Sequence, residues 1–151
     1  MSEPLPDAVP GSYVPETTLK QVPGSRFVQT VGLQLEVIRG DRVIGRVELG
    51  PDHHQPGGIV HGGVYAAIVE EAASYGAMAA AMGRARSVVG VSNTTHFVRA
   101  FSHGRLDVEA LPIQRGRTQQ LWEVCLTDGT GAIVATGQVR LQNLDAGPVT
   151  G

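Results

Sequence analysis

The sequence has little cysteine and no excess of positive charge. Cys125 is the single cysteine among 151 residues, so no intramolecular disulfide can form. Twelve Lys and Arg against 14 Asp and Glu give a net charge of -2, which argues against non-specific binding to nucleic acids or membrane surfaces. Charged residues make up 17% and hydrophobic residues 42%, as in a globular protein rather than a disordered one.

The sequence also lacks a long uninterrupted apolar run. The best candidate, residues 64–82, contains two adjacent acids, Glu70 and Glu71, so we expect no membrane-spanning helix. The first 18 residues have neither a basic start nor an apolar stretch, so no signal peptide is expected. We therefore predict a cytoplasmic protein without nucleic-acid or membrane partners.

Several motifs of nucleotide and hydrolase chemistry are missing. The chain has no P-loop, no dinucleotide-binding fingerprint and no Gly-x-Ser-x-Gly elbow. His53, His54 and His61 are close in sequence, but no cysteine or acid completes a zinc pattern, so no metal is predicted.

The distribution of proline suggests three parts. Residues 1–24 hold five of the nine prolines and no periodic pattern, and are predicted to form a flexible arm. Residues 25–143 have the length of one domain, and residues 144–151 are predicted to form a flexible tail.

The order of predicted elements favours an α+β fold. Residues 24–32 suggest a short helical turn, and residues 33–49 a hairpin around "RGD". The Ala-rich stretch from 62 to about 82 predicts a long helix ended by Gly83, and turn signals divide residues 87–143 into three or four strands. Helices do not alternate with strands, so we predict one helix wrapped by a mostly antiparallel sheet. Sheet edges invite pairing with a second chain, which predicts a homodimer.

The middle of the long helix carries an acid on a smooth face. At 100° per residue Glu70 is surrounded by small residues, including Gly63, Ala66, Ala73 and Ser74, whereas Glu71 projects elsewhere. Small side chains leave room for a ligand or another backbone close to the carboxylate. Two interpretations remain open: a solvated surface acid, or a carboxylate with a chemical role.

The start of the same helix suits an oxygen that gains negative charge. Gly62 and Gly63 are expected to leave their N–H groups uncovered at the positive end of the helix dipole. Glu70 lies two turns on, roughly 10 Å along the axis. One acyl group could touch both only if a neighbouring subunit supplied the helix start. His61, just before the glycines, is either a turn residue or a catalytic base.

The sequence around the start of this helix resembles that of a known family. The stretch "GGIVHGGVYAAIVEEAAS" is similar to the signature of hotdog-fold acyl-CoA thioesterases of the phenylacetate-pathway type, which include the Arthrobacter-type 4-hydroxybenzoyl-CoA thioesterase. The family has Gly three residues before His-Gly-Gly, here Gly58, and an acid nine residues after that His, here Glu70. The resemblance covers about residues 25–143. It implies a hotdog fold, a long helix wrapped by five or six antiparallel strands, that is dimeric and often tetrameric.

The resemblance also implies roles for individual residues. Glu70 would attack the thioester carbonyl or activate the water that does, and the Gly62 N–H would polarise the thioester oxygen. Gln55 would hold the thioester or the nucleophile, and Ser74 would position water. Asn93, in a strand similar to the family's, belongs with Gly63 to the substrate-binding part.

Coenzyme A carries phosphates, and guanidinium groups suit phosphate. Arg99, Arg115 and Arg117 are the candidate ligands, although Arg115 and Arg117 could instead solvate a hairpin turn. The family commonly has Arg-Pro where this chain has Arg99-Ala100. Coenzyme A is then part of the substrate, and no separate cofactor is expected.

Three functions therefore remain open. The first is hydrolysis of an acyl-CoA thioester, and the second is acyl-CoA binding or scaffolding without catalysis, which would not need Glu70. The third is an enoyl-CoA hydratase, which ranks last because "PDHHQPGG" lacks the Asp and His spacing of that class. The acyl group and an acyl carrier protein as alternative donor stay open.

Overall fold

The computed structural model describes residues 19–22, 24–83, 85 and 87–145 of the chain. Its elements follow the predicted order, with two strands before the long helix and four after it. They are α1 (Arg26–Val31), β1 (Gln34–Arg39), β2 (Arg42–Leu49), the 3-10 turn η1 (Pro51–His53), α2 (Gly62–Ala81), β3 (Ser87–Phe97), β4 (Gly104–Arg115), β5 (Gln119–Thr127) and β6 (Ile133–Leu144).

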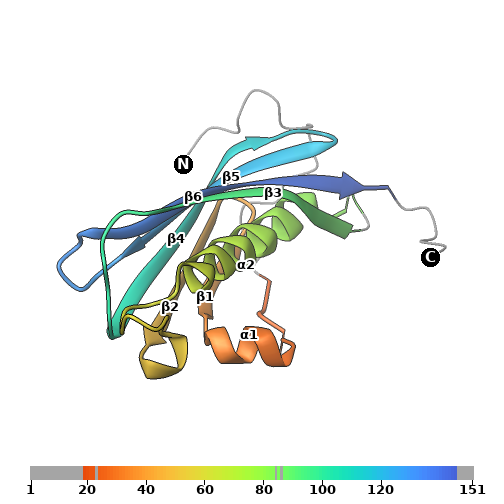
Figure 1. Cartoon of the computed structure of the whole chain (residues 1–151). Coiled ribbons are helices and arrows are strands. Elements are labelled where there is room, and N and C mark those ends of the chain that lie inside the picture. Colours follow the sequence, from red (N-terminus) through yellow and green to blue (C-terminus); the bar gives the residue numbers. More distant parts are fainter. Residues whose placement is uncertain (1–18, 23, 84, 86, 146–151) are drawn as a thin grey trace.

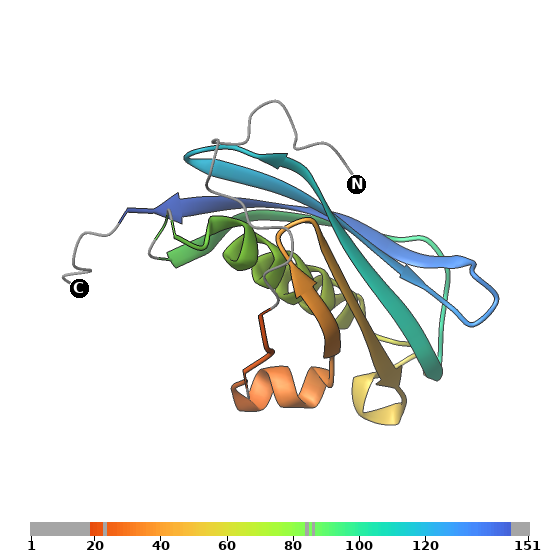
Figure 2. The same ribbon diagram turned by 180° about the vertical axis from the view of Figure 1, so that it is seen from behind.

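The strands form one curved sheet that wraps α2. The strand order is β1-β2-β4-β5-β6-β3, and every neighbouring pair is antiparallel. Figure 1 shows α2 lying along the inside of this sheet, and Figure 2 shows the same arrangement from behind. The predicted α+β architecture is confirmed. The two edges of the sheet are β1 and β3.

The long helix spans Gly62–Ala81, close to the predicted range of 62 to about 82. His61 is the N-cap residue and its side chain accepts the Gly63 N–H, while Gly83 takes a left-handed φ of 79° just beyond the last turn. Between these signals the helix buries one side against the sheet: Ile68, Ala73 and Ala77 are each 0% exposed. The small residues around Glu70 therefore let the sheet approach the helix, in addition to any room that they leave for a ligand.

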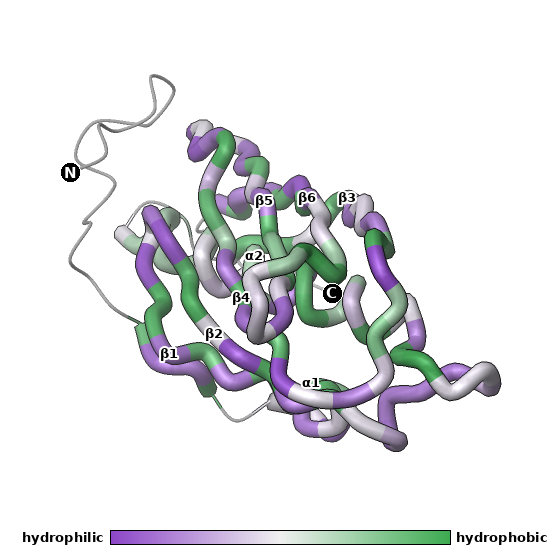
Figure 3. Tube along the Cα trace, turned by 90° about the vertical axis from the view of Figure 1, so that its left-hand side faces the viewer, coloured by the Kyte–Doolittle hydropathy of each residue, from purple (hydrophilic) through white to green (hydrophobic). Residues whose placement is uncertain are grey.

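The strands follow the alternation expected of a sheet with one buried face. The pattern along β2 alternates between exposed and buried, and Figure 3 shows the matching change of hydropathy along β1 and β2. The β1–β2 hairpin turns at Gly40 and Asp41, as predicted. The predicted strand 87–101 ends earlier, at Phe97, because the N–H groups of Val98 and Arg99 both donate to Val134 O and break the ladder.

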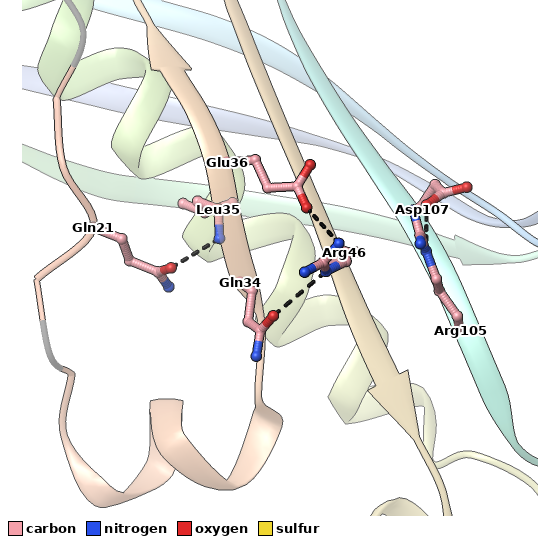
Figure 4. Close-up of polar contacts among 7 residues, drawn as sticks. All are labelled: Gln21, Gln34, Leu35, Glu36, Arg46, Arg105 and Asp107. Carbon is pink, nitrogen blue, oxygen red and sulfur yellow. Dashed lines mark hydrogen bonds and ion pairs between the residues drawn. The ribbon is translucent and has the colours of Figure 1, made fainter.

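The described residues of the predicted arm lie against β1. Leu19 N–H donates to Ile38 O, and the Gln21 side chain donates to Leu33 O and accepts the Leu35 N–H at 2.8 Å (Figure 4). Residues 19–22 thus pack on the domain, although the sequence assigned them to the arm. Residues 1–18 and 23, and the tail from 146, lie outside the described residues.

The last turns of α2 rest on a buried polar cluster. Trp122 of β5 is 0% exposed, and its Nε1 donates to Gln120 Oε1 at 2.9 Å. Gln120 Nε2 donates in turn to Ala77 O and to Asn143 Oδ1. Because every buried polar group here has a partner, the cluster fixes how α2 sits on β5.

At Gly76 the helix α2 approaches the indole ring of Trp122 closely. A Cβ added at Gly76 would lie 2.5 Å from a ring carbon of Trp122. Helix propensity alone favours alanine by about 1 kcal/mol, but overpacking a rigid ring costs about 1–3 kcal/mol. We expect Gly76→Ala to lower the free energy of unfolding, measured by urea denaturation. A more stable variant would mean that the ring can move.

Candidate active site

The start of α2 is closed by its own capping residue. His61 has φ -64° and ψ 134°, and its Nδ1 accepts the Gly63 N–H at 2.8 Å. This differs from the expectation that both glycine N–H groups are uncovered. Among the described residues only the Gly62 N–H of this pair has no acceptor. The capping bond occupies Nδ1 of His61, so only Nε2 remains available for proton transfer.

A pocket lies beside the free N–H. It has a volume of about 370 Å³, and the residues around it include Gln55, Ile59, Gly62, Tyr65, Phe97 and Arg99. Its walls carry two aromatic rings, those of Tyr65 and Phe97, with centroids 5.9 Å apart. Gly62 leaves room for the ring of Phe97, because a Cβ at this position would lie 2.5 Å from it and the ring would have to shift. Burial of the Tyr65 side chain raises the pKa of its hydroxyl.

Gln55 reaches the pocket from the loop before α2. Its N–H donates to Ile59 O, and its side-chain Oε1 accepts the Gly57 N–H at 2.8 Å. Both bonds stay within the loop, so the amide Nε2 is the part of Gln55 that makes no hydrogen bond to a described residue. The structure therefore brings Gln55, Gly62 and Arg99 together around one pocket.

Glu70 lies further along α2 and faces β3. Asn93 Nδ2 donates to Glu70 Oε2 at 2.9 Å and to Ala66 O at 3.0 Å. Gly90 sits opposite the other carboxylate oxygen, and a Cβ at Gly90 would collide with Glu70 Oε1. Glu70 is half-buried and Asn93 is exposed, so the hydrogen bond between them lies at the surface where the helix meets the strand. The fixed contact with Asn93 disfavours the interpretation of Glu70 as a freely solvated acid.

The neighbouring acid has a different environment. Glu71 faces the segment before α1, where Gln21 Nε2 lies 3.5 Å from its Oε1. Burial raises the pKa of Glu71, and the Gln21 hydrogen bond opposes that rise. The two adjacent carboxylates thus point to different parts of the molecule, as the helical spacing predicted.

Ser74 lies one turn beyond Glu70 and is half-buried. Its hydroxyl makes no hydrogen bond to a described residue, so the predicted role in holding water stays a prediction.

The three candidate arginines are not together. Arg99 borders the pocket, is about half exposed and pairs with Asp128 at 3.5 Å. Arg115 is 4% exposed and donates to Gly40 O at 3.1 Å, so within this chain its guanidinium cannot reach a solvent-borne phosphate. Arg117 is exposed in the β4–β5 turn, at the opposite end of the sheet from the helix start.

The three histidines near the helix start do not converge on one point. His53 Nε2 bonds Thr30 O at 2.8 Å, His54 Nε2 bonds Ser102 O at 2.5 Å, and His61 caps α2. No group of three His, Cys, Asp or Glu side chains within the described part of the chain is arranged to hold a metal ion.

Within one chain the two halves of the predicted site remain apart. Gly62 and the pocket are at the start of α2, while Glu70 and Asn93 are two turns on, roughly 10 Å along the axis. Glu70 does not line the pocket. This is the separation that led us to expect a second subunit.

Comparison with known proteins identifies the family. The family model of the thioesterase superfamily matches residues 57–135. This range begins in the loop before α2, includes α2, β3, β4 and β5, and ends at the start of β6. The "Putative esterase Rv1847" of Mycobacterium tuberculosis is 47% identical over 124 residues, which cover 81% of this chain and 89% of that protein. The chain belongs to the thioesterase superfamily.

Solved structures agree with this assignment. The structure of the M. tuberculosis protein superposes with a TM-score of 0.79 at 46% identity, over 82% of this chain and 100% of the other. That of S. sahachiroi AziG gives a TM-score of 0.76 at 46% identity, over 80% and 98%. The hotdog fold expected from the resemblance is confirmed.

A more distant relative is named for the reaction that it catalyses. The 1,4-dihydroxy-2-naphthoyl-CoA hydrolase of Listeria monocytogenes is 29% identical over 75% of this chain and 91% of that enzyme. Together with membership of the superfamily, this supports thioester hydrolysis as the general activity of the chain.

None of the helices in the described residues is long and apolar enough to cross a membrane.

Two residues of the site, Gly90 and Thr95, were not predicted from the sequence. Thr95 Oγ1 donates to Asn93 Oδ1 at 2.7 Å. Neither residue belongs to a motif, and simple alternation along 87–101 does not show which side chains face the helix. A bulge in the strand decides this, and its position has no clear signal in the sequence.

Proposed function

We propose that the protein hydrolyses an acyl-CoA thioester to the free acid and coenzyme A. The observation that carries the proposal is Glu70, whose carboxylate is held between α2 and β3 by Asn93, on a helix whose free N–H borders an aromatic pocket. In a member of the thioesterase superfamily this pair matches the two needs of the reaction: an acid near the carbonyl carbon, and a donor for its oxygen.

The reaction then has two steps. In the general-base route Glu70 takes a proton from water, and the resulting hydroxide adds to the thioester carbon while the Gly62 N–H binds the oxyanion. The carbon–oxygen double bond re-forms, the carbon–sulfur bond breaks, and the thiolate takes the proton from Glu70. In the nucleophilic route Glu70 itself adds to the carbon, the thiolate leaves, and water cleaves the mixed anhydride. Coenzyme A enters with the substrate, and we propose no separate cofactor.

We also propose a homodimer with sites shared between chains. The separation of Gly62 from Glu70 along one helix supports this. The edge strand β3 supports it too, because every residue in it except Val88 and Thr95 is exposed, including Val89, Val91 and Phe97. Unpaired edges with apolar side chains favour association with a second chain. A tetramer and a cytoplasmic location remain predictions.

Within the superfamily we propose the phenylacetate-pathway type. Gly58, the His-Gly-Gly triplet, Glu70 and Gln55 support this placement. The pocket rings of Tyr65 and Phe97 suit an apolar acyl group, and the Listeria monocytogenes relative is named for an aromatic acyl-CoA.

The deciding experiment measures release of free thiol from a panel of aromatic and medium-chain acyl-CoA thioesters. Turnover of at least one ester, with stoichiometric acid, is the expected result. Tight binding without thiol release would instead support the acyl-CoA-binding alternative. A product hydrated at a double bond would support the hydratase.

Arg99 and Arg117 are the remaining candidates for phosphate contacts, because Arg115 is buried. Binding that is equal in the ground and transition states affects KM and not kcat. We expect Arg99→Ala to raise KM for the coenzyme A ester about tenfold and to leave kcat nearly unchanged. Arg117→Ala should raise KM only if the nucleotide reaches the far end of a neighbouring chain.

Two comparisons make the arginine test specific. A pantetheine ester of the same acyl group, without the nucleotide, should show no difference between Arg99→Ala and the unaltered protein. Arg42→Ala removes a guanidinium that is also about half exposed and paired with an acid, Glu109, but on a different part of the sheet, and should leave KM unchanged. Equal impairment on both esters would show that Arg99 shapes the pocket and does not contact the nucleotide.

A further inference from the structure

In β3, the strand opposite Glu70, the set of side chains that face α2 changes halfway along. In the β3–β6 ladder Gly90 pairs with Leu141 and Ser92 with Arg140, so Val91 is an extra residue without a partner. An extra residue shifts the alternation of a strand by one position. Without this bulge the residues facing α2 after Gly90 would be Ser92 and Thr94.

With the bulge the residues facing α2 are Asn93 and Thr95. The Asn93 side chain contacts Glu70 and Ala66 O of the helix. Thr95 Oγ1 lies beside Val69, because a Cβ added at Gly137 would be 2.9 Å from both. The bulge thus brings the Asn93 amide to the Glu70 carboxylate and the Thr95 hydroxyl to that amide.

Both ends of the Asn93 amide have partners, which fix its orientation. Its Nδ2 has two hydrogens, which go to Glu70 Oε2 at 2.9 Å and to Ala66 O at 3.0 Å. Its Oδ1 accepts the Thr95 hydroxyl at 2.7 Å. If the amide flipped, its oxygen would face two acceptors and its NH₂ would face the hydroxyl. A hydroxyl can accept as well as donate, so the two acceptor oxygens, of Glu70 and Ala66, select the orientation in which Asn93 donates. The Thr95 hydroxyl then holds Asn93 Oδ1 in that orientation.

The two oxygens of Glu70 consequently differ. Oε2 is held by Asn93, while Oε1 makes no hydrogen bond to a described residue and faces Gly90, which has no side chain to fill the space. We infer that Asn93 and Thr95 are positioning residues that hold Glu70 by Oε2 and leave Oε1 as the oxygen that reacts. The inference rests on the proposed role of Glu70. It holds for either route, because Oε1 takes the proton from water in one and attacks the thioester carbon in the other.

Thr95→Val tests the inference with the smallest change. Valine keeps the shape of threonine but cannot donate to Asn93 Oδ1, so the amide that holds Glu70 loses one of its three hydrogen bonds and its position is less well fixed. Because misplacement of a reacting group by about 1 Å can cost up to 10²-fold, we expect kcat to fall about tenfold with KM within about twofold of the unaltered protein. Thr95→Ser keeps the hydroxyl and should restore kcat. Thr94→Val makes the same change one residue away, on the other face of β3, and should leave kcat unchanged.

Asn93→Asp is the stronger variant. It has nearly the shape of asparagine but replaces the donor by a second carboxylate next to Glu70, so kcat should fall further than in Thr95→Val. Circular dichroism and thermal melting of each variant establish that it folds.

A double-mutant cycle separates this inference from the proposed function. If Thr95 acts through Glu70, Thr95→Val should cause no further loss of the residual activity of Glu70→Gln, measured at high enzyme concentration. An equal loss in both backgrounds, a change confined to KM, or a Thr95→Ser variant as slow as Thr95→Val would overturn the inference while leaving Glu70 as the catalytic carboxylate. Normal turnover of Glu70→Gln would overturn the proposed function, and the inference with it.

Discussion

Replacing Glu70 by glutamine should lower kcat for thioester hydrolysis by about 10²-fold or more, because the side chain can then neither accept a proton nor attack the carbonyl carbon. Glutamine is close to glutamate in shape, and its oxygen can still accept the hydrogen bond from Asn93 Nδ2. The fold should therefore be retained. Steady-state thiol release by the purified variant, with its melting temperature alongside, measures both expectations.

Glu71→Gln is the matched control, because it makes the same chemical change one residue along the same helix. Glu71 faces Gln21 and the segment before α1, so the variant should keep most of the activity. Burial raises the pKa of Glu71, which means that folding disfavours its charged form. A raised pKa favours the folded state at low pH, and this contribution is lost as pH rises through the folded pKa. At neutral pH the neutral glutamine should thus leave stability unchanged or slightly higher.

The control also defines the outcome that contradicts the assignment. Near-normal turnover by a folded Glu70→Gln variant would show that Glu70 takes no part in catalysis. A loss of similar size in Glu71→Gln would mean that the helix as a whole, rather than one carboxylate, is sensitive to the change.

Local signals in the sequence were enough to predict the main elements. The Ala-rich run between His61 and Gly83 carries its own start and stop, and the "RGD" turn lies between two alternating strands. These features depend on neighbours a few residues apart, which a sequence displays directly. The spacing of Gly58, His61 and Glu70 also depends on one loop and one helix, so the resemblance could be stated before any contact was known.

Features that depend on distant contacts could not be predicted in the same way. Arg115 resembles a turn residue in sequence, but its guanidinium is buried against Gly40, 75 residues away. The bulge at Val91 is defined only by its pairing with β6. The bond from Gly63 to His61 is local, yet histidine is not among the usual capping residues, so the glycine was expected to be free.

The second large effect concerns the Gly62 N–H, which a proline at this position removes. Proline is favoured at the first position of a helix, and the extended ψ of 134° at His61 suits a following proline. Gly62→Pro should therefore fold. Its kcat should fall by about 10²–10³-fold, which is the usual loss when one oxyanion-hole donor is removed. Gly62→Ala is the control: it adds the same Cβ next to Phe97 but keeps the N–H, so any additional loss in the proline variant belongs to the donor.

Hybrid dimers then show whether the donor and the acid of one site come from different chains. In a hybrid of one Gly62→Pro chain and one Glu70→Gln chain, a shared arrangement leaves one site with an intact Gly62 and an intact Glu70. Two differently tagged chains, co-expressed and purified over both tags, should thus recover about half of the unaltered activity, although either homodimer is nearly inactive. If each site lies within one chain, the same hybrid is inactive.

The reciprocal hybrid reverses both outcomes. A chain carrying Gly62→Pro and Glu70→Gln together, paired with an unaltered chain, has no complete site if sites are shared, because each site receives one defective group. If sites lie within single chains, the unaltered chain keeps its own, and about half of the activity remains. Exchange of subunits during the assay would blur both results, so the tagged hybrids are re-purified after it to check their composition. An active reciprocal hybrid beside an inactive first one would exclude the shared site, and Glu70 and Gly62 would then have to meet within one chain despite the two helical turns between them.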